Sequence, residues 1–189
     1  GMPQNHIWEG GGDVTKDGIP FFPNMPTEEV FSVPDKDHVN GTLVSSMPLN
    51  HNGSLIENFR FTFRDGLIVD YSAQKGEKLL KHILDTDEGS RRLGEIALVP
   101  ADSPISNLNI LFYNTLFDEN ASCHFALGSA YPSCIENGCS LSKEELAKRG
   151  VNDSINHIDF MVGTDDLSII GIEADGTETP IFQNGNWAF

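Results

Sequence analysis

Apolar and polar side chains alternate over residues 55–63. This period of two predicts a β-strand, one face of which carries Leu55, Glu57, Phe59, Phe61 and Phe63. The Asp65-Gly66 pair that follows is typical of a tight hairpin turn, so residues 67–71 are expected to form the returning strand. Asn52-Gly53, just before the first strand, is a second turn signal.

Helical patterns occur in three places. Apolar residues recur at helical spacing within residues 73–85, where Leu79, Leu80, Ile83 and Leu84 share one face. Residues 142–149 open with a capping-box pair, Ser142 and Glu145, and stop at Gly150. A third helix is expected over residues 118–130, ending before Pro132.

The remaining apolar segments are short and read as strands. They cover residues 93–99, stopped by Pro100, and residues 157–162, 167–172 and 179–182. Residues 10–18 are expected to be a loop, and the three prolines within residues 20–26 predict an extended or turning segment. Strands outnumber helices and are often joined by hairpins. The predicted fold class is therefore α+β, with a mainly antiparallel, hairpin-rich sheet and a few helices, in a single domain spanning residues 1–189.

Composition limits the classes of function. The 189 residues carry 28 acidic and 12 basic side chains, for a formal charge of −16. Such a surface disfavours nucleic acid and anionic membranes, and it favours divalent cations or amines. No apolar stretch approaches the ~20 residues of a membrane helix. Three cysteines without a CxxC spacing indicate free thiols in a reduced, cytoplasmic protein. Gly1 before Met2 reads as a cloning scar, and a fragment of a longer protein is expected.

Two acidic segments are candidates for chemistry. Glu28 and Glu29 fit either the start of a short solvated helix capped by Thr27 or a pair of functional carboxylates. Glu95 lies in an otherwise apolar run that reads as a core strand. Because an ionised carboxylate is costly to bury alone, Glu95 must form an ion pair with Arg91 or Arg92, face outward, or bind a metal.

Two further segments contain histidine. Glu119 and His124 lie five residues apart, and His124 suits either a structural hydrogen bond or metal ligation, whereas its neighbour Cys123 is expected to pack in the core. On a strand over residues 157–162, His157 and Asp159 point to the same side. They form either a solvent-facing polar stripe or half of a metal site, and imidazole with carboxylate suits Zn, Mn or Co.

Together these segments offer three glutamates, two histidines and one aspartate, a ligand set of the right size for two divalent metals that share a bridging carboxylate. Composition and spacing do not show that these segments meet in the folded protein. A carboxylate-pair hydrolase, such as a glycosidase using two of Glu28, Glu88 and Glu95, therefore stays open as an alternative.

The same segments resemble the M29 family of metallo-aminopeptidases. The matching text covers nearly the whole chain, at residues 24–31, 46–49, 87–100, 103–106, 112–120, 123–124, 130–132 and 157–161. The resemblance is to the C-terminal, metal-binding portion of a larger two-domain protein, and the N-terminal domain of the family is absent. Family members form homodimers, so peptide substrates and a second copy are the expected partners, with no nucleic acid and no membrane.

The resemblance also implies roles for individual residues. In the family, residues matching Glu29, Glu95, Glu119, His124, His157 and Asp159 hold two divalent ions (Zn, Co, Mn or Mg), with the residue matching Glu95 as the bridge. Tyr131 matches a family active-site tyrosine, and Glu28 is assigned as the general base. The implied activity is removal of the N-terminal amino acid from peptides. A catalytically inactive metal-binding or interaction fragment is the alternative.

Overall fold

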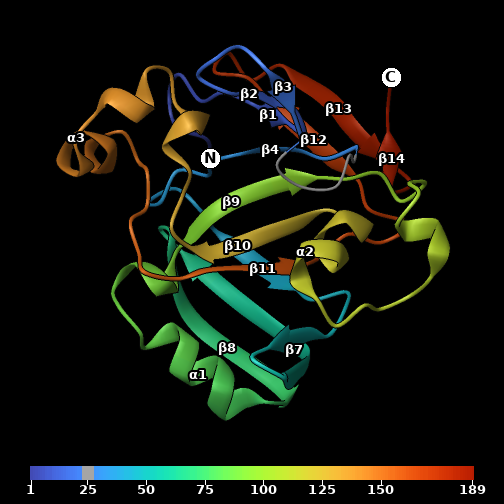
Figure 1. Ribbon diagram of the computed structural model, residues 1–189. Helices are drawn as coiled ribbons and strands as arrows, with labels where there is room; N and C mark the ends of the chain where they lie inside the picture. Colours follow the sequence, from blue (N-terminus) through green and yellow to red (C-terminus); the bar gives the residue numbers. More distant parts are fainter. Residues whose placement is uncertain (23–27) are drawn as a thin grey trace.

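The computed structural model describes residues 1–22 and 28–189. Its central element is an antiparallel five-stranded sheet in the order β1-β4-β9-β10-β11 (Figure 1). These strands are β1 (Glu9–Gly10), β4 (Val30–Ser32), β9 (Leu93–Leu98), β10 (His124–Gly128) and β11 (His157–Met161). The sheet therefore joins segments from both ends of the chain, with β1 and β11 at its edges.

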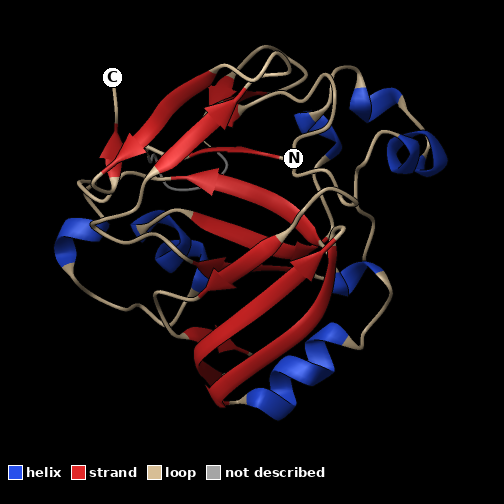
Figure 2. Cartoon of the chain, turned by 180° about the vertical axis from the view of Figure 1, so that it is seen from behind, coloured by secondary structure: helices blue, strands red, loops and turns tan. Residues whose placement is uncertain are grey.

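A second antiparallel sheet is built around the predicted long hairpin. It contains β5 (Gly41–Val44), β6 (Leu49–His51), β7 (Ser54–Arg64) and β8 (Leu67–Lys75). Asp65 and Gly66, between β7 and β8, have φ angles of 48° and 77°, the left-handed conformation that a two-residue hairpin turn requires. Helix α1 (Glu77–Leu84) follows β8 and lies along the outer end of this hairpin (Figures 1 and 2).

The other elements surround the two main sheets. Strands β2 (Asp13–Val14) and β3 (Pro20–Phe21) pair with each other, and a three-stranded sheet contains β12 (Ile169–Ile172), β13 (Glu178–Gln183) and β14 (Asn186–Trp187). Helices α2 (Thr115–Asp118) and α3 (Lys143–Lys148) are short. Single 3-10 turns occur at Gly89–Arg91, Ser106–Leu108, Glu119–Ala121, Pro132–Cys134 and Gly138–Ser140. The predicted α+β class with mainly antiparallel sheets is confirmed. Within the described ranges, no helix is long and apolar enough to cross a membrane.

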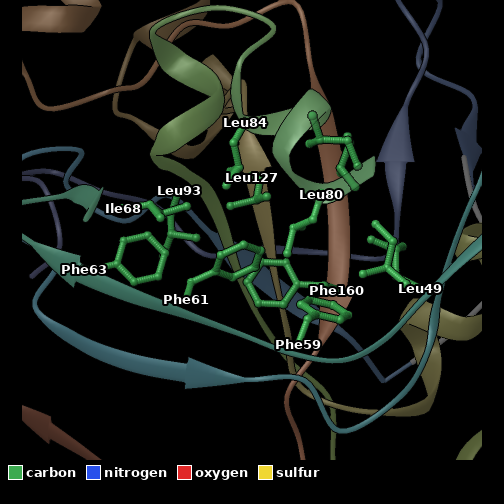
Figure 3. Close-up of a cluster of buried hydrophobic side chains, with 13 residues drawn as sticks. Leu49, Phe59, Phe61, Phe63, Ile68, Leu80, Leu84, Leu93, Leu127 and Phe160 are labelled. Atoms are coloured by element: carbon green, nitrogen blue, oxygen red, sulfur yellow. The ribbon is translucent and has the colours of Figure 1, made fainter. Parts of the chain in front are cut away.

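The largest apolar cluster joins one face of the five-stranded sheet to the second sheet and to α1 (Figure 3). The Phe160 ring of β11 lies 5.2 Å from the Phe61 ring and 5.9 Å from the Phe59 ring, measured between centroids. Leu80 and Leu84 of α1 belong to the same cluster. Burying one such side chain stabilises the fold by roughly 1.5–3 kcal/mol. This face of the central sheet is therefore part of the core.

An irregularity in β9 determines which side chains reach the opposite face. Ala126 of β10 pairs with Glu95, but the next residue, Leu127, pairs with Leu93, so Gly94 is the extra residue of a β-bulge. Regular alternation would put Leu93 and Glu95 on the same face. Because of the bulge, Leu93 joins the core and Glu95 faces the other way. A Cβ at Gly94 would lie 2.3 Å from the carbonyl oxygens of Gly128 and Ser129, so this position requires glycine.

Most of the predicted elements are confirmed with small shifts in their ends. Strands occupy the segments predicted at residues 93–99, 157–162, 167–172 and 179–182. The capping box of α3 is complete, since Ser142 and Glu145 each accept the other's backbone N–H. All three cysteines are free, and Cys123 is buried as expected.

The helix predicted over residues 118–130 is wrong. Helix α2 ends at Asp118, a 3-10 turn covers Glu119–Ala121, and β10 begins at His124. A short apolar run does not distinguish a buried strand from a buried helix by spacing alone. Pairing with β9 on one side and β11 on the other makes this segment a strand.

Three other details differ from the prediction. The helix predicted over residues 73–85 begins only at Glu77, because β8 continues to Lys75 and Gly76 takes a left-handed φ of 80°. The predicted loop over residues 10–18 contains β2. Pro23, Pro26 and Thr27 lie outside the described residues, so the predicted helix cap is not described.

The predicted face of the long strand is also only partly right. Phe59, Phe61 and Phe63 are buried together, but Ile56 is the buried residue at the start of β7, not Leu55. Asn58 has a φ of 50° and interrupts the alternation between these two parts of the strand.

Candidate metal centre

The face of the five-stranded sheet opposite the core carries a cluster of acidic and imidazole side chains. Glu95 comes from β9, His124 from β10, and His157 and Asp159 from β11, while Glu29 directly precedes β4. The bulge in β9 and the alternation of β11 thus direct these side chains to one side.

Ala126 makes room for the cluster. It lies in β10, directly opposite both Glu95 and Asp159, and it is fully buried. Residues opposite each other in antiparallel strands have Cβ atoms roughly 5 Å apart, so a longer side chain here would occupy the space between the two carboxylates.

Glu95 lies between the two histidines. Its Oε1 is 3.4 Å from Nε2 of His124, and its Oε2 is 3.6 Å from Nε2 of His157. Oε1 of Glu29 lies 3.1 Å from Nε2 of His124, and Oδ1 of Asp159 lies 3.3 Å from Nε2 of His157. The donors therefore form two groups that share Glu95, and within each group the donor atoms lie within 4.8 Å of one another.

Backbone carbonyls orient both imidazole rings. Nδ1 of His124 lies 3.1 Å from the carbonyl oxygen of Ser122, and Nδ1 of His157 lies 2.7 Å from that of Ser129. Because a carbonyl oxygen only accepts hydrogen bonds, each Nδ1 carries the proton that it donates. Each Nε2 then faces the carboxylates and has a lone pair for a cation in the neutral ring.

The cluster leaves buried polar atoms without hydrogen bonds. Nε2 of His124 and Oδ1 of Asp159 are both buried, and neither makes a hydrogen bond to any residue that the structure describes, although charged partners lie close by. Leaving such an atom unsatisfied costs about 1–3 kcal/mol. Two ligands of one tetrahedral zinc ion lie roughly 3.4 Å apart, given metal–ligand distances near 2.1 Å. The observed separations of 3.1–3.6 Å fit cation binding.

The electrostatics of the cluster also favour added positive charge. Burial raises the pKa of the Glu95 carboxyl, and the neighbouring Asp159 raises it further, against the opposing effect of His124. Burial lowers the pKa of His157, but the carboxylate of Asp159 outweighs it and raises this pKa to about 9. The same competition, with Glu29 and Glu95 as the main carboxylates, raises the pKa of His124.

A cavity of about 380 Å³ opens above the cluster and includes two further predicted site residues. Glu119 and Tyr131 line it together with Glu29, Glu95, His157 and Asp159. The Tyr131 ring packs 4.9 Å from the His157 ring, centroid to centroid. Burial raises the pKa of the Tyr131 phenol to about 12, with further contributions from Glu95, Asp159 and Glu119. Glu119 shares the cavity but belongs to neither donor group among the described residues.

Glu28 is exposed, and it is not among the described residues that line this cavity. Glu88 is also exposed and lies outside the lining, so it does not form a carboxylate pair with Glu95 there. The alternative that Glu95 forms an ion pair with Arg91 or Arg92 is wrong. Arg91 pairs with Asp85 at 2.6 Å, and Arg92 pairs with Asp37 at 3.0 Å.

The cavity has a wall that the sequence patterns did not predict. Glu9, Asp13 and the three glycines between them line it beside Phe31 and Ser133. The glycine run indicated only a loop, and no pattern distinguishes Glu9 from other acidic residues in this chain. A larger cavity of about 500 Å³ lies beside Cys123, but Asp165 is the one carboxylate among its described lining residues. The candidate metal ligands therefore lie at the smaller cavity.

Comparison with known proteins identifies a family of metalloproteases. The family described as Thermophilic metalloprotease (M29) matches residues 1–187. The chain is 61% identical to Aminopeptidase 2 of Geobacillus stearothermophilus and 59% identical to Aminopeptidase AmpS of Bacillus subtilis, in each case covering 100% of this chain and 46% of the relative.

A solved structure shows the same fold. The wild-type AmpT structure from Thermus thermophilus superposes with a TM-score of 0.94 at 45% identity, covering 100% of this chain and 46% of that one. The chain thus spans about half the length of the relatives it matches. Because the family match covers nearly every residue, this chain belongs to the M29 family of metalloproteases.

Proposed function

We propose that this chain provides the metal centre of a metal-dependent aminopeptidase, which hydrolyses the N-terminal residue from peptides. The observation that carries the proposal is the position of Glu95, a buried carboxylate whose two oxygens face two separate donor groups. A shared carboxylate of this kind is typical of two-metal hydrolases. The relatives named as aminopeptidases support the same activity.

The proposed ligands are divided between two divalent ions. Glu29 and His124 would serve one ion, His157 and Asp159 the other, and Glu95 both; Glu119 would complete the set from the cavity wall. Carboxylate with imidazole suits Zn, Co or Mn, and Mg is also compatible with the oxygen ligands. When bound, such ions lower the pKa of a water molecule and polarise a peptide carbonyl.

Residues of this chain would transfer the proton of the attacking water and stabilise the negative charge that develops on the peptide carbonyl oxygen. Tyr131 borders the cavity beside His157, and its phenol would donate a hydrogen bond to the oxygen that becomes negative as the peptide carbonyl is attacked. On the family resemblance, Glu28 is the proposed general base, although it is exposed and is not among the described residues that line the cavity. In this role it would take a proton from water and pass it to the leaving amine.

The proposal extends to partners and location. Peptides would be the substrates, and the active form would be a homodimer, as the family resemblance implies. Three free cysteines support a reducing, cytoplasmic location. An inactive metal-binding fragment is the second candidate, because the chain spans only 46% of the relatives' length.

Metal titration by calorimetry tests the centre. We expect two zinc or cobalt ions per chain. We also expect Glu95→Gln to weaken binding of both ions by about 100-fold, because the neutral amide removes the shared carboxylate. Glu88→Gln is the matched control, since Glu88 is exposed outside the cavity, and it should bind two ions normally. Normal loading of both ions by Glu95→Gln would contradict the bridging role.

Hydrolysis of an aminoacyl reporter then separates the two candidates. The aminopeptidase requires activity that EDTA abolishes, whereas the inactive fragment binds metal without activity. Tyr131→Phe should keep both ions and lower kcat by 10²–10³-fold, the range for loss of one oxyanion donor. Loss of metal in this variant would make Tyr131 a ligand or a structural residue.

A further inference from the structure

Glu9 lies on the same face of the central sheet as the metal cluster. In the strand register, Glu9 of β1 is opposite Phe31, Phe31 is opposite Ala97, and Ala97 is opposite His124. Residues directly opposite in antiparallel strands point to the same side. Glu9 therefore belongs to one cross-strand row with His124, and it lines the cavity that opens above the cluster.

Backbone contacts hold the segment before β1 beside the site. The Ile7 N–H donates to the carbonyl oxygen of Cys134 at 2.8 Å, and His6 pairs with Ile135. Cys134 ends the 3-10 turn that follows Tyr131, and Tyr131 lines the cavity together with Glu9.

The charge of the cavity is not balanced by the proposed ions alone. Its described lining contains six carboxylates and neither lysine nor arginine. Four of them, Glu29, Glu95, Glu119 and Asp159, would offset two divalent ions. Glu9 and Asp13 remain. Oδ1 of Asp13 already accepts the N–H of Val14 at 2.6 Å, whereas Glu9 has no basic group within 4.0 Å among the described residues.

Distance decides what Glu9 can bind. Three strand spacings of roughly 4.8 Å separate β1 from β10, which puts the Glu9 backbone about 14 Å from that of His124. Among the described residues, Glu9 belongs to neither group of donor atoms that lie within 4.8 Å of one another, so it is not one of the candidate metal ligands. A long substrate side chain can nevertheless extend from the cluster to Glu9. Gly10 leaves the way open, because a Cβ there would have no atom within 4 Å.

We propose that Glu9 determines specificity by binding the ammonium or guanidinium group of a basic side chain in the peptide substrate. The inference depends on the proposed function, since it takes the donor cluster as the place where the peptide bond is cleaved. Glu9 would act by charge-assisted hydrogen bonding and would take no part in bond cleavage. The α-ammonium of the substrate is the other cation in reach of the cavity, and the experiment distinguishes the two.

Calorimetric binding of two amino alcohols tests the assignment. Lysinol and norleucinol both carry an α-amine, lack a peptide bond, and differ in the ammonium at the end of the side chain. We expect the wild-type chain to bind lysinol about tenfold more tightly, and Glu9→Gln to reduce this ratio to near one. Asp17→Asn is the matched control, because Asp17 is exposed outside the cavity, and it should keep the ratio.

Each other outcome overturns the proposal. An unchanged ratio in Glu9→Gln removes Glu9 from substrate recognition, and equal weakening of both probes means that Glu9 binds the α-ammonium instead. If Glu9→Gln does not fold, Glu9→Asp keeps the charge on a shorter side chain and should reduce the ratio only in part. The probes cannot be hydrolysed, so their binding ratio can be measured both with and without zinc. The zinc stoichiometry, measured separately, shows whether the proposed metal centre is present. A failure of the proposed function is therefore distinguished from a failure of the Glu9 assignment.

Discussion

The two faces of the five-stranded sheet carry neighbouring residues of the same strands but differ in chemistry: one face is apolar core, and the other carries the polar side chains of the cavity. In β11, Ile158 and Phe160 enter the apolar core, whereas His157 and Asp159 face the cavity. The core face gains stability from buried area. The other face holds buried carboxylates and imidazoles, two of which have atoms without hydrogen bonds among the described residues.

This difference shows how the fold supports a destabilising site. Buried charges that repel one another cost free energy until a cation binds, so the cluster alone does not favour the folded state. The phenylalanine-rich core directly behind it, built from β7, α1 and β11, supplies the compensating stability. The face that carries the candidate metal ligands therefore depends on the core face, and substitutions on the two faces should have different effects.

The largest expected effect on stability comes from the core face. Phe160→Ala should lower the free energy of unfolding by about 3–5 kcal/mol, because it removes a fully buried ring that contacts Phe59 and Phe61. Urea unfolding of the metal-free chain measures this. Val69→Ala, at a half-exposed position on β8, is the control and should change the free energy by less than about 0.5 kcal/mol. A small effect of Phe160→Ala would mean that the two faces do not differ as described.

A substitution at the bulge should affect both faces. Gly94→Ala places a Cβ 2.3 Å from two backbone oxygens, so we expect a loss of about 2–3 kcal/mol in unfolding free energy and weaker metal binding as Glu95 moves. Gly10→Ala, with open space around its Cβ, is the matched control. Calorimetric titration together with urea unfolding tests the link. Lower stability with unchanged metal affinity would show that the bulge does not position Glu95.

The smallest effect concerns a carboxylate outside both faces. Burial raises the pKa of Asp87, but hydrogen bonds from the Ile155 N–H and from Ser90 and Ser154 outweigh it and lower this pKa to about 2. A lowered pKa in the folded state means that the stabilisation is complete above about pH 4 and is lost as the pH falls through about 2.

Asp87→Asn should therefore lower the unfolding free energy by about 1 kcal/mol at pH 7, a value reduced for solvent screening of this partly exposed group, and the difference should vanish near pH 2. Urea unfolding across this range measures it, with metal stoichiometry at pH 7 unchanged. A difference that does not depend on pH would assign the effect to packing rather than to charge.

Local patterns predicted much of the fold but only part of the site. The turn at Asp65-Gly66, the capping box of α3 and the alternation of β11 depend on nearby residues, and each is present in the structure. The helix predicted over residues 118–130 failed because that segment becomes a strand only through its two neighbours. Glu9 gave no signal, because its place in the cavity depends on the pairing of β1 with β4.

The sequence alone determined the residue types of the candidate metal site and that His157 and Asp159 lie on the same side of β11, since alternation along a strand is a local property. Only the tertiary structure decided that Glu95 faces them. The bulge at Gly94 puts Glu95 on the face opposite Leu93, and its register is set by pairing with β10, far along the chain. A local pattern does not contain this information, because hydrogen bonds between distant segments select the register.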